Sequence, residues 1–142
     1  IKENHLAPYV ILHGRQAGQM LDLLFELCDF GIGSLGRHRS GITNIKTLKN
    51  REYAARGIPF IYSEIDEDFE NMPYIMKIPA NEEAVDIKQI LNFYNQLHIT
   101  PLEIRNSIRH LSWNNQMKKV LDEMQKKDKI NLNNNNIANF AT

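Results

Sequence analysis

The sequence lacks features that mark several classes of protein. It has one cysteine among 142 residues, so an internal disulfide is excluded, and Cys28 lies in an apolar helical pattern that predicts a small buried side chain in a reducing compartment. Its 17 basic and 17 acidic side chains leave no net charge, which argues against nucleic acid or an anionic membrane as a partner. No apolar run has the length of a membrane span, and the first residues do not resemble a signal peptide. We therefore expect a cytoplasmic protein.

Length and apolar content fit one globular domain with its own core. The chain opens on Ile1 rather than Met, from which we expect a fragment or cleaved piece. Beyond Lys126 the chain turns to lysine and then to an asparagine-rich run with little to bury. We therefore expect residues 1–127 to fold and residues 128–142 to form a disordered or non-native Asn-rich tail.

Runs with the spacing of strands alternate with runs that have the spacing of helices. The expected strands cover residues 9–13, 30–32, 58–62 and 74–78, and the expected helices cover residues 16–28, 44–56, 86–98, 100–111 and 112–126. Such alternation is typical of an α/β protein with a Rossmann-like, doubly wound parallel sheet. Ligands of such sheets bind beyond the carboxyl ends of the strands.

The stretch of residues 29–62 carries the strongest functional signal. A loop between its first strand and its helix contains Gly33, Gly36 and Gly41 and the basic side chains Arg37, His38 and Arg39. The glycines allow the backbone to turn sharply and to direct N–H groups at a ligand. Because the helix amino terminus adds a partial positive charge, the loop is predicted to bind an anion, a diphosphate more readily than a single carboxylate.

Glu52 is the unusual residue of the following helix. It shares a stripe with Leu48 and Ala55, at i, i+4 and i+7, and this stripe is predicted to face the sheet. A carboxylate buried there needs a partner. Two interpretations remain open, because Glu52 either accepts hydrogen bonds from ribose hydroxyls at the edge of the sheet or lies exposed and pairs with Arg56.

The order of strand, glycine-containing loop, helix with a glutamate, Gly-x-Pro and second strand resembles the carboxyl-terminal domain of retaining GT-B glycosyltransferases, especially family 4. The matching residues are Glu52, Ala54, Ala55, Gly57 and Pro59. The family carries another glutamate eight positions earlier, which faces the transferred sugar, and this chain has Asn44 there. The resemblance therefore implies a ribose contact for Glu52, while Asn44 either bonds a sugar hydroxyl or caps the helix.

The resemblance implies a nucleotide-diphospho-sugar donor, with UDP or GDP as the nucleotide, and transfer to a saccharide or lipid-linked acceptor without a cofactor or bound metal. The candidate donor-binding residues are Gly14, Arg15, Gly36, Arg37, Asn44, Leu48, Lys49 and Glu52. By this resemblance the base lies near Gly14, where Arg15 either stacks on it or is solvated. Lys49, one turn before Glu52, is the first candidate for the diphosphate, and the alternative is a solvated helix lysine.

Two parts of the family have no counterpart in this sequence: the acceptor-binding amino-terminal domain and the glycine-rich unit that opens the donor domain. We therefore expect the chain to be inactive without a missing acceptor-binding domain, through which any peripheral membrane contact is made. The alternative function is a non-catalytic nucleotide-binding or protein-interaction domain with the same sheet. A receiver-type signalling domain is discounted, because the first strand ends in His13 rather than in an aspartate.

Three further patterns give local expectations. The acidic run at residues 63–71 predicts a solvated loop, since it lacks the glycine and the spacing of a calcium-binding loop. A capping box that starts a helix is formed by Thr100, Pro101 and Glu103. Ser112 and Trp113 open a further helix, which resembles the closing helix of family 4, and Trp113 is expected to anchor it by packing.

Overall fold

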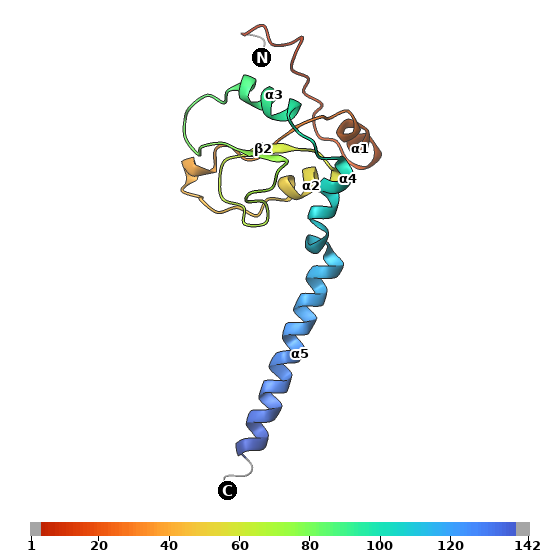
Figure 1. The fold of residues 1–142 in the computed structure, drawn as a ribbon, viewed down its shortest axis with the longest axis vertical. Helices are drawn as coiled ribbons and strands as arrows, with labels where there is room; N and C mark the ends of the chain where they lie inside the picture. The colour runs from red at the N-terminus through yellow and green to blue at the C-terminus, as the bar shows by residue number, and fades with distance from the viewer. Residues whose placement is uncertain (1–3, 139–142) are drawn as a thin grey trace.

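The computed structural model describes residues 4–138 and places side chains for residues 4–127. A body built around a small sheet carries one long helix that projects from it (Figure 1). The helices are α1 (Gly18–Glu26), α2 (Leu48–Arg56), α3 (Ile87–Asn95), α4 (Pro101–Ser107) and α5 (Trp113–Ala138), with short 3-10 helices η1 (Arg37–Ser40) and η2 (Arg109–Leu111). The strands are β1 (Gly31–Ile32), β2 (Phe60–Tyr62) and β3 (Ile75–Lys77).

The three strands form one parallel sheet in the order β1-β2-β3. In its register Gly31 lies beside Phe60, and Phe60 lies beside Ile75. The chain passes from β1 to β2 through η1 and α2, whereas a loop without a helix joins β2 to β3. The result is a mixed α/β fold compatible with a Rossmann-like domain. The three strands in the described part of the chain are too few to confirm the predicted doubly wound sheet.

The main core lies on the face of the sheet that α2 and α4 cover (Figure 1). Its buried members are Ile45, Ala54, Phe60, Tyr62, Phe69, Tyr74, Ile104 and Ile108. Phe60 is central, because its ring lies 5.5 Å from that of Phe69 and 5.6 Å from that of Tyr53 on α2. Burying each large apolar side chain contributes about 1.5–3 kcal/mol, so this cluster holds the sheet against the helices.

Helix α3 lies on the opposite side of the sheet (Figure 1). The ring of Phe30, just before β1, meets Phe93 and Tyr94 of α3 edge-on, with centroids 6.3 and 6.1 Å apart. Edge-to-face pairs of this kind are favourable because of the ring quadrupole. α3 begins where Asp86 accepts hydrogen bonds from the N–H groups of Lys88 and Gln89, close to the predicted start.

The ends of α2 and α4 follow from local sequence signals. Thr47 caps α2 by accepting the N–H of Asn50, and Gly57 ends the helix in the left-handed region at φ +76°. A side chain at Gly57 is also excluded by space, because a Cβ there would lie 2.6 Å from the carbonyl oxygen of Pro101. The predicted capping box at the start of α4 is confirmed, with reciprocal bonds between Thr100 and Glu103.

The prediction of a strand at residues 9–13 is wrong. The segment has no strand partner, and the side chains of Tyr9, Ile11 and Leu12 are exposed. Strand propensity is realised only against neighbouring strands, and no described strand pairs with this run. The prediction of a buried Cys28 is also wrong. α1 ends at Glu26, so the cysteine lies beyond the helix and is exposed, with its thiol donating to the carbonyl of Leu24.

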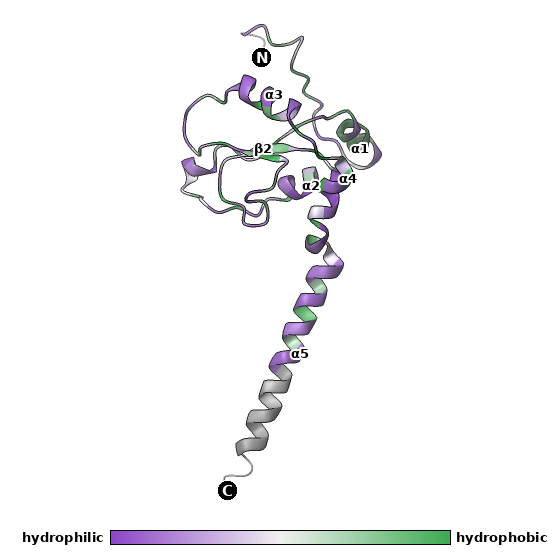
Figure 2. Cartoon of the chain, viewed as in Figure 1, coloured by the Kyte–Doolittle hydropathy of each residue, from purple (hydrophilic) through white to green (hydrophobic). Residues whose placement is uncertain are grey.

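The last helix begins at Trp113, as predicted, but it leaves the body of the protein (Figure 1). Trp113 is 82% exposed, so the prediction that it anchors the helix by packing is wrong. The tail was predicted to begin at residue 128, but α5 continues past this position to Ala138. Residues 139–142 lie outside the described residues. Figure 2 shows apolar residues concentrated in β2 and mixed with polar ones along α5 as far as Lys127. Among residues 4–138, no helix has both the length and the apolar content to cross a bilayer.

Candidate anion site at the carboxyl edge of the sheet

The segment after β1, residues 33–41, is called the glycine loop below. It leaves the sheet beside β2, because Gly33 donates its N–H to the carbonyl of Ile61 at 2.8 Å and Ser63 donates to the carbonyl of Ser34 at 3.1 Å. A Cβ at Gly33 would lie 2.8 Å from the Ile61 carbonyl oxygen, so this approach requires glycine. The loop therefore lies at the edge where parallel sheets bind ligands.

Glu64, two residues beyond β2, holds the glycine loop from the sheet side. Its Oε1 accepts the backbone N–H of Arg37 at 2.6 Å. Glu64 is 2% exposed, and its Oε2 has no hydrogen-bond partner among the described residues. The backbone N–H of Arg37 is thus already bonded to a carboxylate of the chain itself and is not free for an external anion.

Glu82, beyond β3, holds the same loop from its other side. Its Oε1 accepts from Nε of Arg39 at 2.8 Å and lies 3.0 Å from Nε2 of His38, while Nη2 of Arg39 donates to Oε2. The Arg39 guanidinium, with a smaller contribution from His38, lowers the pKa of Glu82 to about 2. The three side chains border a hollow of about 300 Å³ whose other lining includes Gly36 and Ile78.

The outward face of α2 carries Leu48, Lys49 and Glu52, all exposed. The prediction that the stripe of Leu48, Glu52 and Ala55 faces the sheet is therefore wrong. The buried face instead contains Asn50 and Ala54, because Asn50 finds a polar partner in the interior.

Glu52 was predicted either to bind ribose or to lie exposed and pair with Arg56, and the structure shows the exposed ion pair with Arg56. Its Oε1 accepts from Nε of Arg56 at 2.6 Å, and Arg56 also donates to Asp22 of α1 at 2.6 Å. The Arg56 guanidinium lies 4.2 Å from the ring centroid of Phe25, which completes a contact between α1 and α2. The second oxygen of Glu52 has no protein partner in the described part of the chain, so this carboxylate keeps free acceptor sites.

Asn44 is not the cap of α2, because the helix starts four residues later and Thr47 caps it. Asn44 instead forms an isolated parallel bridge with Ile65, and its exposed side-chain amide donates to Oγ1 of Thr43 at 3.4 Å. Because Ile65 follows β2, this bridge holds the amino terminus of α2 at the carboxyl edge of the sheet. The exposed Lys46 lies in the same connection.

Six of the eight predicted donor residues lie in two segments, the glycine loop and α2 with the connection before it. Those on or before the first half of α2 are Asn44, Leu48, Lys49 and Glu52, and those in the glycine loop are Gly36 and Arg37. Gly14 and Arg15 lie instead in the exposed segment before α1, with Gly14 in a turn at φ +66°. No described hydrogen bond or ion pair joins Arg15 to α2.

The prediction of a solvated acidic loop is wrong for four of its residues, because Ser63, Glu64, Asp66 and Phe69 are buried. Asp66 accepts hydrogen bonds from Asn50 and Arg51 of α2. Asp68 also pairs with Arg51. Within residues 4–138 no three His, Cys, Asp or Glu side chains gather as ligands for a metal ion.

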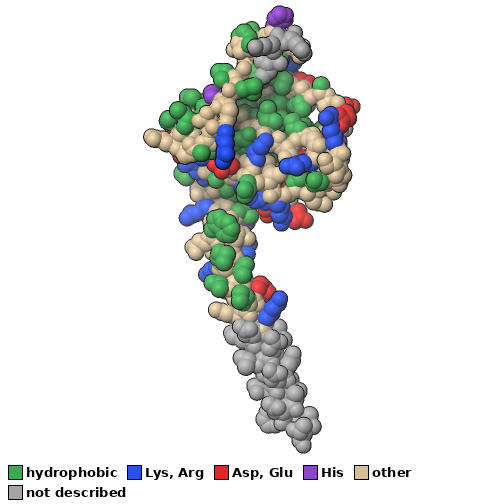
Figure 3. Space-filling model, turned by 180° about the vertical axis from the view of Figure 1, so that it is seen from behind, with side chains coloured by type: hydrophobic (Ala, Val, Ile, Leu, Met, Phe, Trp, Pro, Cys, Tyr) green, Lys and Arg blue, Asp and Glu red, His purple; other side chains and the backbone are tan. Residues whose placement is uncertain are grey.

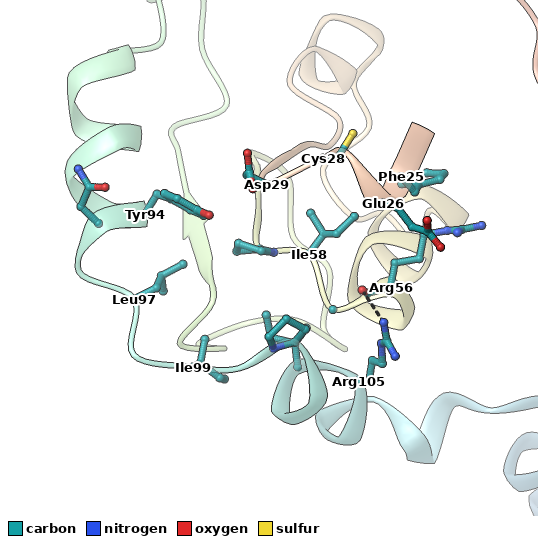
Figure 4. A pocket seen from close by; sticks show the side chains of 15 residues that line it. Phe25, Glu26, Cys28, Asp29, Arg56, Ile58, Tyr94, Leu97, Ile99 and Arg105 are labelled. Carbon is teal, nitrogen blue, oxygen red and sulfur yellow. Dashed lines mark hydrogen bonds between the residues drawn. The ribbon is translucent and has the colours of Figure 1, made fainter. Parts of the chain in front are cut away.

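A larger hollow, of about 730 Å³, lies at the opposite edge of the sheet (Figure 4). Ile58, Tyr94 and Leu97 point into it, and a hydrogen bond from Arg105 to the carbonyl of Arg56 closes one side. Its lining includes Asp29 before β1 and Pro59 before β2, which are amino-terminal ends of strands. It is therefore separate from the predicted ligand edge.

Glu64 and Glu82 are the residues that the sequence analysis missed. Glu64 had a signal, because a carboxylate just beyond a strand stands at the ligand edge of a parallel sheet. Glu82 had none, since its partner Arg39 lies 43 residues earlier and no periodic pattern links them. Searches of protein-family models, curated proteins and solved structures find no match to this chain.

Proposed function

We propose that this chain is the donor-binding domain of a retaining GT-B glycosyltransferase of the family 4 type, and that it binds a UDP- or GDP-sugar. The observation that carries the proposal is the exposed group at the start of α2. Lys49 and Glu52 lie one turn apart on its outward face, and Asn44 lies in the connection before its cap. All three side chains are exposed, so a ligand can reach them, and the bridge from Asn44 to Ile65 holds the start of the helix at the carboxyl edge of the sheet.

In the proposed mechanism this domain binds the donor and stabilises the departing diphosphate. Lys49, the amino terminus of α2 and the glycine loop neutralise the phosphate charge that develops as the sugar leaves, which is the main electrostatic contribution to catalysis. The free oxygen of Glu52 accepts hydrogen bonds from the ribose, while its other oxygen keeps the pair with Arg56. The acceptor and any catalytic base come from another domain, so the chain alone transfers no sugar.

Isothermal titration with UDP and GDP tests the proposal. Glu52→Ala is expected to weaken binding by about 1–3 kcal/mol, because a charge-assisted hydrogen bond to the ribose is lost. Glu123→Ala is the matched control, since Glu123 is an exposed helix glutamate that also pairs with a basic side chain of its own helix. Binding of neither nucleotide by the unaltered chain contradicts the donor role, and an unchanged affinity of the Glu52 variant removes Glu52 from the site.

A second candidate, the protein-interaction domain, is favoured by one feature of α5. Apolar side chains follow one another along this helix and are exposed (Figure 3). They are Trp113, Met117, Val120, Leu121 and Met124. An exposed apolar patch of this kind is typical of a surface that binds another protein. An interaction domain is expected to ignore free UDP and GDP, so the same titration separates the two functions.

A further inference from the structure

Two basic side chains of the glycine loop are already bound to one carboxylate. Nε2 of His38 and Nε of Arg39 both meet Oε1 of Glu82, at 3.0 and 2.8 Å, and Nη2 of Arg39 meets Oε2. Donors from two side chains thus converge on a single anionic group. This is also the arrangement that binds the oxygens of a phosphoryl group.

The contact with Glu82 is open to competition. Arg39 and Glu82 are both exposed, so solvent screens their attraction and the pair adds little stability. The neighbouring hollow has room for a larger group than a carboxylate, because a Cβ built on Gly36 would meet no atom within 4 Å. An anion from solution can therefore reach the same donors.

Glu64 is a second carboxylate that contacts the glycine loop. This carboxylate is 2% exposed and accepts the N–H of Arg37, yet its Oε2 has no hydrogen-bond donor in the described residues. Buried polar atoms without a partner are unfavourable and uncommon. The glycine loop thus supplies this buried carboxylate with one donor, the N–H of Arg37, and leaves its second oxygen without one among the described residues.

We propose that Glu82 is an internal competitor for the anion site of the glycine loop, and that a phosphoryl group of the ligand displaces it from His38 and Arg39. The inference rests on the proposed function for the identity of that ligand, a nucleoside diphosphate group. A phosphoryl group carries more negative charge than a carboxylate and has three acceptor oxygens, so it binds the two basic side chains more strongly. Ligand binding is thereby coupled to release of the segment after β3.

Isothermal titration of inorganic pyrophosphate into the whole chain tests the competition. Glu82→Gln removes the competing charge from an exposed position, so this variant is expected to bind pyrophosphate about tenfold more tightly than the unaltered chain. Arg39→Gln added to Glu82→Gln is expected to abolish the gain, because the guanidinium is the main donor. Glu123→Gln, on α5, is the control for the general effect of removing one negative charge.

The outcomes separate this inference from the proposed function. Equal pyrophosphate affinity of the unaltered chain and Glu82→Gln overturns the competition, even if UDP or GDP binds. A gain in Glu123→Gln as large as that in Glu82→Gln also overturns it, because the effect is then one of net charge. If Glu82→Gln alone gains affinity and neither nucleotide binds to either protein, the competition stands and the donor-domain proposal fails.

Discussion

The side-chain amide of Asn50, on the buried face of α2, donates a 3.0 Å hydrogen bond to the buried carboxylate of Asp66. Arg51 donates to the same carboxylate, from Nη1 at 3.2 Å and Nη2 at 3.3 Å. Because Asp66 lies beyond β2, these bonds fix α2 at the carboxyl edge of the sheet. They also turn the opposite face of α2, with Lys49 and Glu52, toward solvent. The orientation of the candidate site thus depends on a buried polar contact as well as on apolar packing.

Replacing Asp66 by alanine is expected to destabilise the fold strongly. The substitution leaves the Asn50 amide buried without an acceptor and removes one carboxylate from Arg51, at a cost of about 3 kcal/mol. Urea unfolding followed by circular dichroism measures this loss. Asp122→Ala, at an exposed position of α5, is the control and should change stability by less than about 0.5 kcal/mol. Similar unfolding midpoints for the two variants would contradict the role of Asp66.

Gly57 is expected to be far less replaceable than Gly36. An alanine at Gly57 is strained by the positive φ and brings its Cβ within 2.6 Å of the Pro101 carbonyl oxygen. The backbone strain alone costs about 1–3 kcal/mol, and the overlap adds to it by pushing α4 away from α2. Gly36 has negative φ and open space around it, so Gly36→Ala should leave stability nearly unchanged. Thermal unfolding of both variants makes the comparison, and an equal loss of stability would count against this account.

Sequence patterns predicted the helix starts and strands that depend on residues close together in the sequence. The start of α4 was predicted from the capping box at Thr100, whose members lie within three residues of each other. The start of α3 near Asp86 was predicted from the helical spacing of its apolar residues. The strands of the sheet were placed within two residues by their apolar, β-prone runs. Residues 9–13 have the same composition without a partner strand, and they form no strand.

Such patterns could not predict which face of α2 points toward solvent and therefore how the candidate site is oriented. Leu48 and Glu52 suggested an inward stripe, but the inward face of α2 is decided by Asn50, whose partner Asp66 is 16 residues away. A pair of polar residues at that separation leaves no periodicity in the sequence. The same is true of Glu82, which meets the glycine loop only because the carboxyl ends of β1 and β3 lie at one edge of the sheet.

The exposed Trp113 makes a further prediction, which concerns both fluorescence and stability. It is the single tryptophan of the chain and is 82% exposed, so the emission of the folded protein should resemble that of an indole in water and change little on unfolding. Trp113→Ala should alter stability by less than about 0.5 kcal/mol, whereas Ile104→Ala, in the core, should cost about 2–5 kcal/mol. Urea titration and emission spectra test this prediction. A blue-shifted emission would instead mean that another surface covers the tryptophan in solution.

The contact between Glu82 and Arg39 predicts a difference in acid stability between the unaltered chain and Glu82→Gln. A carboxyl group with a lowered pKa in the folded state binds fewer protons there than in the unfolded state, so its contribution to stability rises with pH. For Glu82 that interval runs from about 2 up to the ordinary value of 4.5. The contribution is therefore complete above the ordinary value and is lost as the pH falls toward 2. Because solvent screens this exposed pair, the urea midpoint of the unaltered chain should exceed that of Glu82→Gln only slightly at about pH 6, and the difference should shrink between about pH 5 and pH 3. In an Arg39→Gln background, where the partner guanidinium is absent, the Glu82 substitution should make much less difference at either pH. A midpoint difference that is constant with pH would mean that Glu82 acts on stability through something other than its charge.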